Sequence, residues 1–165
     1  MTNDLLYHGS IYLQTELMPG FKRSGKFVRW DRIESNHFLY STTERDSAVG
    51  LGLFSAFEKA YEVNRCQFDG KNIIIDSDKP DVAIEDIQKL KVYLYTLPHR
   101  ETDGWLKNFN PFNNIKTEYK TLQTIQLDQP AEQIDLKKWL TGKTVTFTKE
   151  KLVTESLQSP IYFNW

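Results

Sequence analysis

Three side chains that could act on one ligand stand far apart in this sequence: His8, Tyr40 and Glu118. An imidazole can hydrogen-bond a hydroxyl group, and the glycine that follows His8 lets a ligand approach the backbone. A phenol ring can stack on a flat cationic ring. A carboxylate held in place can stabilise positive charge on a reacting carbon. If the three converge, they form a site in which a negative oxygen faces a carbon that becomes cationic.

Each residue lies in a short motif that also has a structural interpretation. His8 directly follows the apolar run of residues 5–7 and opens the turn at 8–10, where a histidine can simply be satisfied locally. Tyr40 lies in an aromatic and β-branched run at 38–43, where it could only pack. Glu118 begins a late strand, where it could be an exposed acid. Their order and spacing favour the functional interpretation.

In that order and spacing, Tyr7-His8-Gly9-Ser10, the segment 38–50 and Glu118-Tyr119 resemble the motifs of one enzyme family. These are the ADP-ribosyltransferases of the His-Tyr-Glu type, the diphtheria-toxin-like and poly-ADP-ribose-polymerase-like transferases. The resemblance spans roughly residues 5–127. It implies an α+β fold with a split β-sheet core and NAD as a substrate. It also implies a mono-ADP-ribosyltransferase, which cleaves the nicotinamide-ribose bond and transfers ADP-ribose to a macromolecular acceptor.

The resemblance also implies roles for single residues. Glu118 would stabilise an oxocarbenium-like ribose in the transition state, as carboxylates do in glycoside hydrolysis. His8 would orient NAD through a ribose hydroxyl, and Tyr40 would stack on the nicotinamide. The backbone of Gly9 and Ser10 would bind the nicotinamide amide.

The resemblance implies further NAD contacts near the second motif, the segment 38–50, where this chain also differs from the family pattern. Ser41, directly after Tyr40, belongs to the expected NAD site. Relatives commonly have a second stacking aromatic on the next helix, but the matching position is Leu51, so Phe54, about one turn further on, is our candidate. Lys116 lies where arginine-modifying relatives have Glu or Gln, which disfavours an arginine acceptor.

Two loops are candidates for binding NAD and the acceptor. The segment 21–32 interleaves basic and aromatic residues and includes Arg29. It fits the NAD pyrophosphate or adenosine, because arginine makes bidentate phosphate contacts. A solvated loop and a nucleic-acid contact are the alternatives. The segment 103–116 is where we expect acceptor recognition, with a protein favoured over nucleic acid.

The chain length and the strand and helix patterns in the sequence predict one α+β domain over residues 1–165, with many strands and few helices. We expect an Asp69-Gly70 turn, a helix capped by Thr42 or Thr43, and a long loop at 99–116. We expect the strands at 5–7, 38–43, 73–75, 92–97, 119–127 and 144–148, the helices at 48–61, 81–90 and 132–140, and docking of 160–165 against the sheet.

Composition limits the class of protein. Hydrophobic residues at 39% and charged residues at 26% indicate an ordinary soluble globule, and a net charge of -1 gives no overall attraction to nucleic acid or lipid. The single cysteine and the spacing of the three histidines predict no metal. We expect a monomer without a membrane partner, in the cytoplasm of the producing or a target cell, where it would act as a toxin-like effector or a modifier.

The same motifs leave other functions open. With water as the nucleophile the enzyme would be an NAD glycohydrolase. With RNA as substrate it would be similar to the RNA 2'-phosphotransferases, although their additional Arg and His motifs have no match here. A domain that kept the site without turnover would be a non-catalytic NAD- or nucleotide-binding module.

Overall fold

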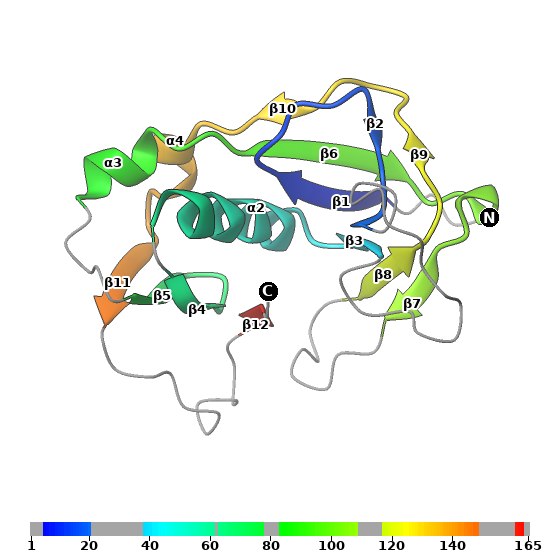
Figure 1. The fold of residues 1–165 in the computed structure, drawn as a ribbon. Helices are drawn as coiled ribbons and strands as arrows, with labels where there is room; N and C mark the ends of the chain where they lie inside the picture. The colour runs from blue at the N-terminus through cyan, green and yellow to red at the C-terminus, as the bar shows by residue number, and fades with distance from the viewer. Residues whose placement is uncertain are drawn as a thin grey trace.

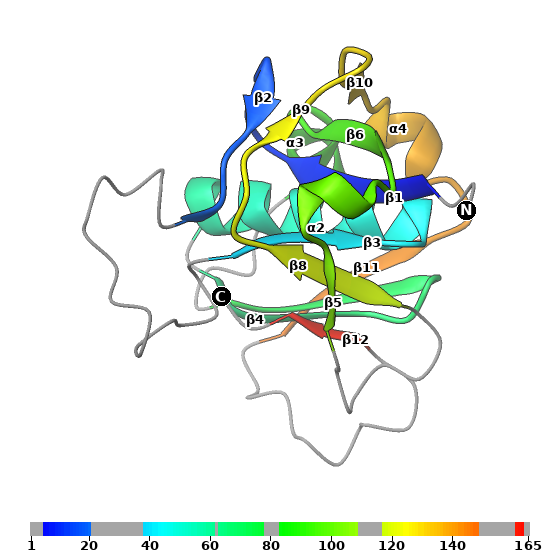
Figure 2. The ribbon, with the colours of Figure 1, turned by 90° about the vertical axis from the view of Figure 1, so that its right-hand side faces the viewer.

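The structure is a computed structural model that describes residues 5–20, 38–61, 63–77, 83–108, 117–148 and 161–163. These ranges form a mixed α and β protein in which strands outnumber helices, so the expected α+β class is confirmed (Figure 1). Two sheets lie on either side of the helix α2, Arg45–Ala60 (Figures 1 and 2).

The larger sheet has six antiparallel strands in the order β10-β6-β1-β3-β8-β7. Its strands are β1 Leu5–Ser10, β3 Leu39–Thr42, β6 Tyr93–Pro98, β7 Leu106–Asn108, β8 Glu118–Thr121 and β10 Glu132–Gln133. β1 and β3 therefore lie at the centre of the sheet, and β8 lies next to β3. His8, Tyr40 and Glu118 are thus carried by three adjacent strands.

The second sheet has four strands in the order β11-β5-β4-β12. Its strands are β4 Val63–Phe68, β5 Asn72–Ser77, β11 Thr144–Thr148 and β12 Ile161–Phe163. β11 runs parallel to β5, and β12 pairs with β4, so the C-terminal segment docks on a sheet as expected. The Asp69-Gly70 turn is also confirmed: Asp69 Oδ1 accepts hydrogen bonds from the backbone of Lys71 and Asn72, and Gly70 has φ of 97°.

Two hydrophobic clusters hold these layers together. The first lies around α2, between the two sheets, and includes Leu53, Phe57, Phe68 and Ile75. The second covers the opposite face of the larger sheet, under the small β2–β9 ribbon of Glu16–Leu17 and Ile125–Gln126. Because α2 is covered from two sides, it buries residues around most of its circumference rather than along one stripe.

Glycines let α2 lie directly against β1. A Cβ at Gly9 would overlap the carbonyl oxygen of Ala48, and one at Gly52 would lie 3.2 Å from the backbone of both Gly9 and Ser10. A Cβ at Gly50 would lie 2.9 Å from the Phe68 ring. Close packing thus offsets the low helix propensity of Gly50 and Gly52. Gly9 faces a helix rather than a ligand.

Several expected elements differ in detail. The N-cap of α2 is Glu44, whose side chain makes no capping hydrogen bond to the helix, rather than Thr42 or Thr43. Thr42 Oγ1 accepts a hydrogen bond from the Glu44 backbone before the helix begins. The segment expected as one strand at 119–127 is two, β8 and β9, because residues 122–124 bend between them. The segment expected as a helix at 132–140 begins as β10 and becomes helical only in α4, Leu136–Trp139.

The segment 99–116 is not a plain loop. It contains the short 3₁₀ helix η3, Glu101–Asp103, and the strand β7, while residues 109–116 lie outside the described ranges. The helix expected at 81–90 is present as α3, Ile84–Gln88. Arg29 and the whole segment 21–32 also lie outside the described residues.

The contact between β1 and α2 leads to a stability prediction. Gly9→Ala should lower the free energy of unfolding by about 3 kcal/mol, because the added methyl group must displace the Ala48 carbonyl or the helix. Urea denaturation measures this directly. Ser10→Ala, on the next residue, is the control and should cost less than about 1 kcal/mol. A Gly9→Ala variant as stable as the wild type would show that the helix does not press on β1.

Candidate functional site

The two halves of the larger sheet are joined by a single residue pair. β1 pairs with β6 over six positions, and β3 pairs with β8 over four, but β1 and β3 pair only at Tyr7 and Thr42. Beyond that pair the residues from His8 onward have no register with β3. We call this place, where β1 and β3 separate, the sheet opening. It divides β10-β6-β1 from β3-β8-β7.

His8 bridges the sheet opening. Its Nδ1 lies 2.7 Å from the carbonyl oxygen of Tyr40. Since a carbonyl only accepts hydrogen bonds, Nδ1 must donate, so the neutral imidazole carries its lone pair on Nε2. The ring also lies 6.1 Å, centroid to centroid, from Tyr95, its partner in register on β6. His8 is therefore held in one tautomer, with its ring between the two halves of the sheet.

Tyr40 and Glu118 share one face of the sheet. Thr42 lies opposite Glu118, and Tyr40 lies opposite Lys120, so Tyr40 and Glu118 are diagonal neighbours on adjacent strands. Both side chains are partly buried. Burial raises the pKa of the Tyr40 phenol above its ordinary value, and the negative charge of Glu118 raises it further. The phenol is thus neutral at physiological pH, and its ionisation depends on the charge of the Glu118 carboxylate.

Alternation along the strands places the side chain of His8 differently. Tyr7, Thr42 and Glu118 are in register and share the face that packs towards α2. His8 follows Tyr7 and is in register with Tyr95, a residue of the second cluster on the opposite face. The structure therefore brings Tyr40 and Glu118 together directly and connects His8 to them through the Tyr40 carbonyl.

The sequence analysis missed three residues on the Tyr40–Glu118 face. The Phe38 ring lies 6.2 Å from the Tyr40 ring at a tilt of 57°, and Lys120 Nζ lies 4.6 Å from the Phe38 centroid. Asn108, the last residue of β7, donates a hydrogen bond from Nδ2 to Glu118 Oε2 at 3.2 Å. Strand alternation could have identified Phe38, two positions before Tyr40. Lys120 and Asn108 require the register of β8.

The expected NAD contacts lie in different places. Gly9 packs against α2, and Ser10 Oγ accepts a bond from the Tyr12 backbone at 3.1 Å. Ser41 is 4% exposed and lies on the face opposite Tyr40, and its hydroxyl has no hydrogen-bond partner among the residues that the structure describes. Phe54 has no exposed surface, because it is part of the cluster around α2. A ring without exposed surface cannot stack on a ligand in this conformation, so we no longer assign Phe54 that role.

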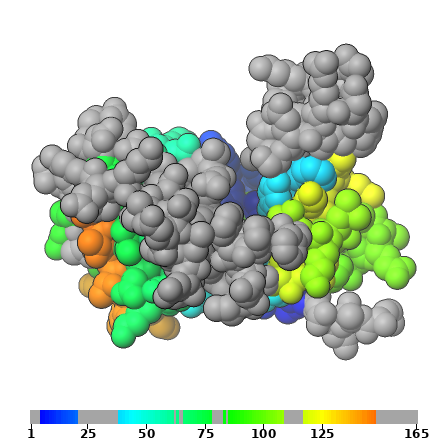
Figure 3. Space-filling model, turned by 90° about the horizontal axis from the view of Figure 1, so that it is seen from below, coloured from blue at the N-terminus to red at the C-terminus, as the bar shows by residue number. Residues whose placement is uncertain are grey.

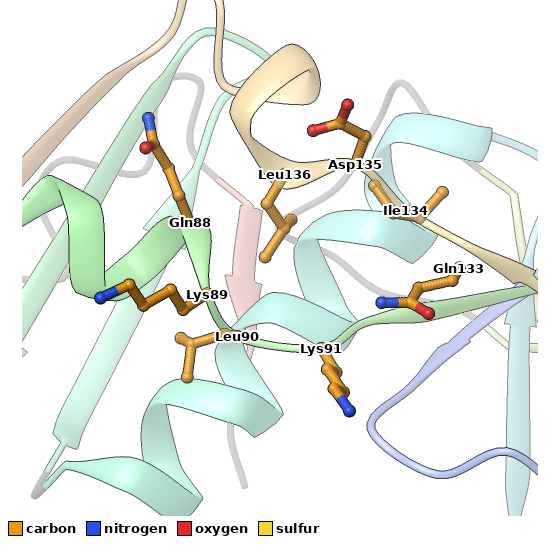
Figure 4. A pocket seen from close by; sticks show the side chains of 8 residues that line it. All are labelled: Gln88, Lys89, Leu90, Lys91, Gln133, Ile134, Asp135 and Leu136. Atoms are coloured by element: carbon orange, nitrogen blue, oxygen red, sulfur yellow. The ribbon is translucent and has the colours of Figure 1, made fainter.

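A separate pocket of about 450 Å³ lies between residues 88–91 and 133–136 (Figure 4). It is near α3 and α4, at the end of the molecule away from β7 and β8 (Figure 1). Its two lysines point apart, Lys89 to the left and Lys91 downward, so their charges do not converge on one ligand (Figure 4). None of the expected site residues lines it. We therefore place the candidate site at the sheet opening and not in this pocket.

Figure 3 shows the molecule from below. Residues of β3 (cyan) and of β7 and β8 (yellow-green) are visible on one side, and those of β5 and β11 (green and orange) on the other.

Within the described ranges, no three His, Cys, Asp or Glu side chains are grouped so that they could hold a metal ion. No helix among those same residues has the length and apolar character needed to cross a bilayer.

Comparison with known proteins adds no relative to this description. No family model, no curated protein and no solved structure matches the chain. The assignment of a function therefore depends on the residues at the sheet opening and on the motifs that carry them.

The proximity of Tyr40 and Glu118 can be tested by titration. Glu118→Gln removes the negative charge that disfavours the phenolate, so the Tyr40 pKa should fall, while staying above its ordinary value because burial is the larger cause. NMR of protein with ¹³C-labelled tyrosine, titrated upward in pH, measures this shift. Glu85→Gln, on α3 at the other end of the molecule, is the control and should leave the Tyr40 pKa unchanged. Equal titration curves for all three proteins would contradict the arrangement.

Proposed function

We propose that this protein is a mono-ADP-ribosyltransferase that uses NAD as its substrate. One observation supports the proposal above the others. Tyr40 and Glu118, an aromatic ring and a carboxylate 78 positions apart in the chain, share one face of adjacent strands, beside a histidine bonded to the Tyr40 carbonyl. These are the three residue types, in the order, that the sequence motifs suggest for this chemistry.

Cleavage of the nicotinamide-ribose bond requires a negative group beside the ribose. When the bond between the ribosyl carbon and the nicotinamide nitrogen breaks, the electron pair leaves with nicotinamide, which becomes neutral, and positive charge develops on the sugar. A Glu118 oxygen next to this carbon would stabilise the charge. An acceptor nucleophile would then bond to the carbon and lose its proton. Preorganised groups of this kind lower a barrier because they need little reorientation as charge develops.

Tyr40 and His8 would orient the substrate. The Tyr40 phenol is partly buried and neutral, so it offers a flat face on which cationic nicotinamide can stack. His8, with Nδ1 committed to the Tyr40 carbonyl, can accept a hydrogen bond from a ribose hydroxyl at Nε2. Since the same carbonyl links the two residues, moving the histidine would also disturb the strand that carries the tyrosine.

The loss of the carboxylate tests the proposed chemistry. Glu118→Gln should slow nicotinamide release from NAD by about 100-fold or more, because a neutral amide stabilises a cationic sugar far less than a carboxylate does. The assay uses NAD labelled in the adenosine half, with free nicotinamide measured by chromatography. Glu132→Gln, on the edge strand β10, is a matched control that should retain wild-type activity. A fully active Glu118→Gln protein would refute the mechanism.

The same assay separates transfer from hydrolysis and from simple binding. A transferase will place label on macromolecules of an added lysate. Release of nicotinamide without transfer indicates an NAD glycohydrolase. NAD binding without release, in any lysate, indicates a binding module and contradicts the proposal.

Stacking by Tyr40 makes a separate prediction about substrate affinity. Tyr40→Ala should raise the KM for NAD by about tenfold, which corresponds to about 1.4 kcal/mol of lost stacking. Tyr40→Phe keeps the ring and should leave KM within about twofold of the wild type, because the stacking energy depends on the ring face and not on the hydroxyl. Steady-state kinetics with varied NAD distinguishes the two. Equal KM values for Tyr40→Ala and the wild type would rule out stacking by this ring.

A further inference from the structure

Asn108 and Glu118 form a directly opposed pair across the last two strands of the larger sheet. β7 and β8 are antiparallel, and Asn108 is in register with Glu118. Directly opposed residues have Cβ atoms about 5 Å apart, a distance that an asparagine and a glutamate side chain can span. The Asn108 amide does so, with Nδ2 3.2 Å from Glu118 Oε2.

This hydrogen bond occupies one carboxylate oxygen and not the other. Among the described residues, no other side chain makes a hydrogen bond to the Glu118 carboxylate. Oε1 is therefore the oxygen that can turn towards a ligand. An amide donor bonded to a charged acceptor makes a charge-assisted hydrogen bond, which is stronger than one between neutral groups.

We propose that Asn108 is a positioning residue, which holds Oε2 so that Oε1 points to the reacting ribosyl carbon. This inference depends on the proposed function of Glu118. A glutamate side chain has three rotatable bonds, and each loses entropy when the carboxylate is held in one place. A partner that fixes one oxygen before the substrate arrives removes that cost from the reaction itself. Small misplacements of a catalytic group lower rates strongly.

The chemical type of residue 108 fits this task. An amide offers a donor without a charge, so it leaves the carboxylate negative and uncompensated for the cationic sugar. Lysine or arginine in its place would neutralise that charge. Aspartate has the same shape as asparagine but no donor, and it would repel Glu118. The task therefore depends on the Nδ2 donor of Asn108 rather than on its size.

A role in stability alone is a poorer explanation for this bond. β7 is a short strand at the edge of the sheet, and its other two residues, Leu106 and Lys107, are exposed. Asn108 itself is only partly buried. The pairing of β7 with β8 is made by backbone groups, which a change of side chain leaves in place. Removing the amide should therefore affect the carboxylate more than the fold.

The first experiment compares two variants of similar size to asparagine. Asn108→Leu should lower kcat for nicotinamide release by about tenfold, since it removes one charge-assisted hydrogen bond. Asn108→Asp should lower it further, because two carboxylates would then face each other. The KM for NAD should stay within about twofold in both, because the proposed role of Asn108 is to hold Glu118 and not to bind NAD. Gln126→Leu is the control and should leave kcat unchanged, because it removes the amide-to-carboxylate hydrogen bond from Gln126 Nε2 to Glu16 Oε2 in the β2–β9 ribbon, which holds none of the proposed site residues.

The second experiment asks whether Asn108 acts through Glu118. In a Glu118→Ala background, Asn108→Leu should cause no further loss of rate, because the carboxylate that it positions is absent. The ¹⁵N shift of the Asn108 side-chain amide should also move in the Glu118→Ala protein, which reports the hydrogen bond without any need for activity. An equal loss in both backgrounds, or an unchanged amide shift, would refute the positioning role.

The outcomes separate this inference from the function on which it depends. If the wild-type protein releases no nicotinamide from NAD, the proposed function fails, and the positioning role fails with it. If the wild type is active and Asn108→Leu retains full kcat, the proposed function stands and only the positioning role is wrong.

Discussion

The contact between the backbones of β1 and α2 is the constraint on which the arrangement of the site depends. It requires glycine at position 9, where a Cβ would overlap the Ala48 carbonyl oxygen, and it favours glycine at position 52, where a Cβ would lie 3.2 Å from the β1 backbone. With β1 held against the helix, the residue before Gly9 has a fixed position, and that residue is His8. β3 leads directly into α2, so the same helix also sets where β3 ends. Packing of one helix thus positions both sides of the sheet opening.

Both burial and charge act on the side chains around Glu118. Burial and the nearby carboxylate both keep the Tyr40 phenol neutral. Lys120 places a cation on the same face, where its Nζ lies over the Phe38 ring and makes no ion pair with Glu118 within the described part of the chain. A carboxylate compensated by a hydrogen bond rather than by an ion pair keeps its negative charge available. This is the electrostatic condition that cleavage of the nicotinamide-ribose bond would require, since the charge that appears in the reaction is positive.

Residues with strong local patterns were predictable, and residues defined by register were not. The central strand at Tyr40 follows from its aromatic and β-branched run, and the Asp69-Gly70 turn from its turn chemistry. β7 has three residues, mostly exposed, and is a strand only because β8 pairs with it. Phe54 was our candidate for a stacking ring because it lies about one turn after Leu51, but two sheets cover α2 and its ring has no exposed surface. The sequence around Phe54 does not reveal that a second sheet covers the other side of α2.

The geometry around Phe38 bears on how nicotinamide would be held. The Phe38 and Tyr40 rings are tilted by 57°, so they do not form the two parallel walls of a clamp. Lys120 Nζ already lies over the Phe38 ring, and a second cation cannot share that face without repulsion. A cationic nicotinamide would therefore stack on Tyr40, the ring next to the Glu118 carboxylate. Once the bond breaks, nicotinamide becomes neutral and loses its cation–π attraction to that ring, so a site with one stacking ring favours release of the product over its retention.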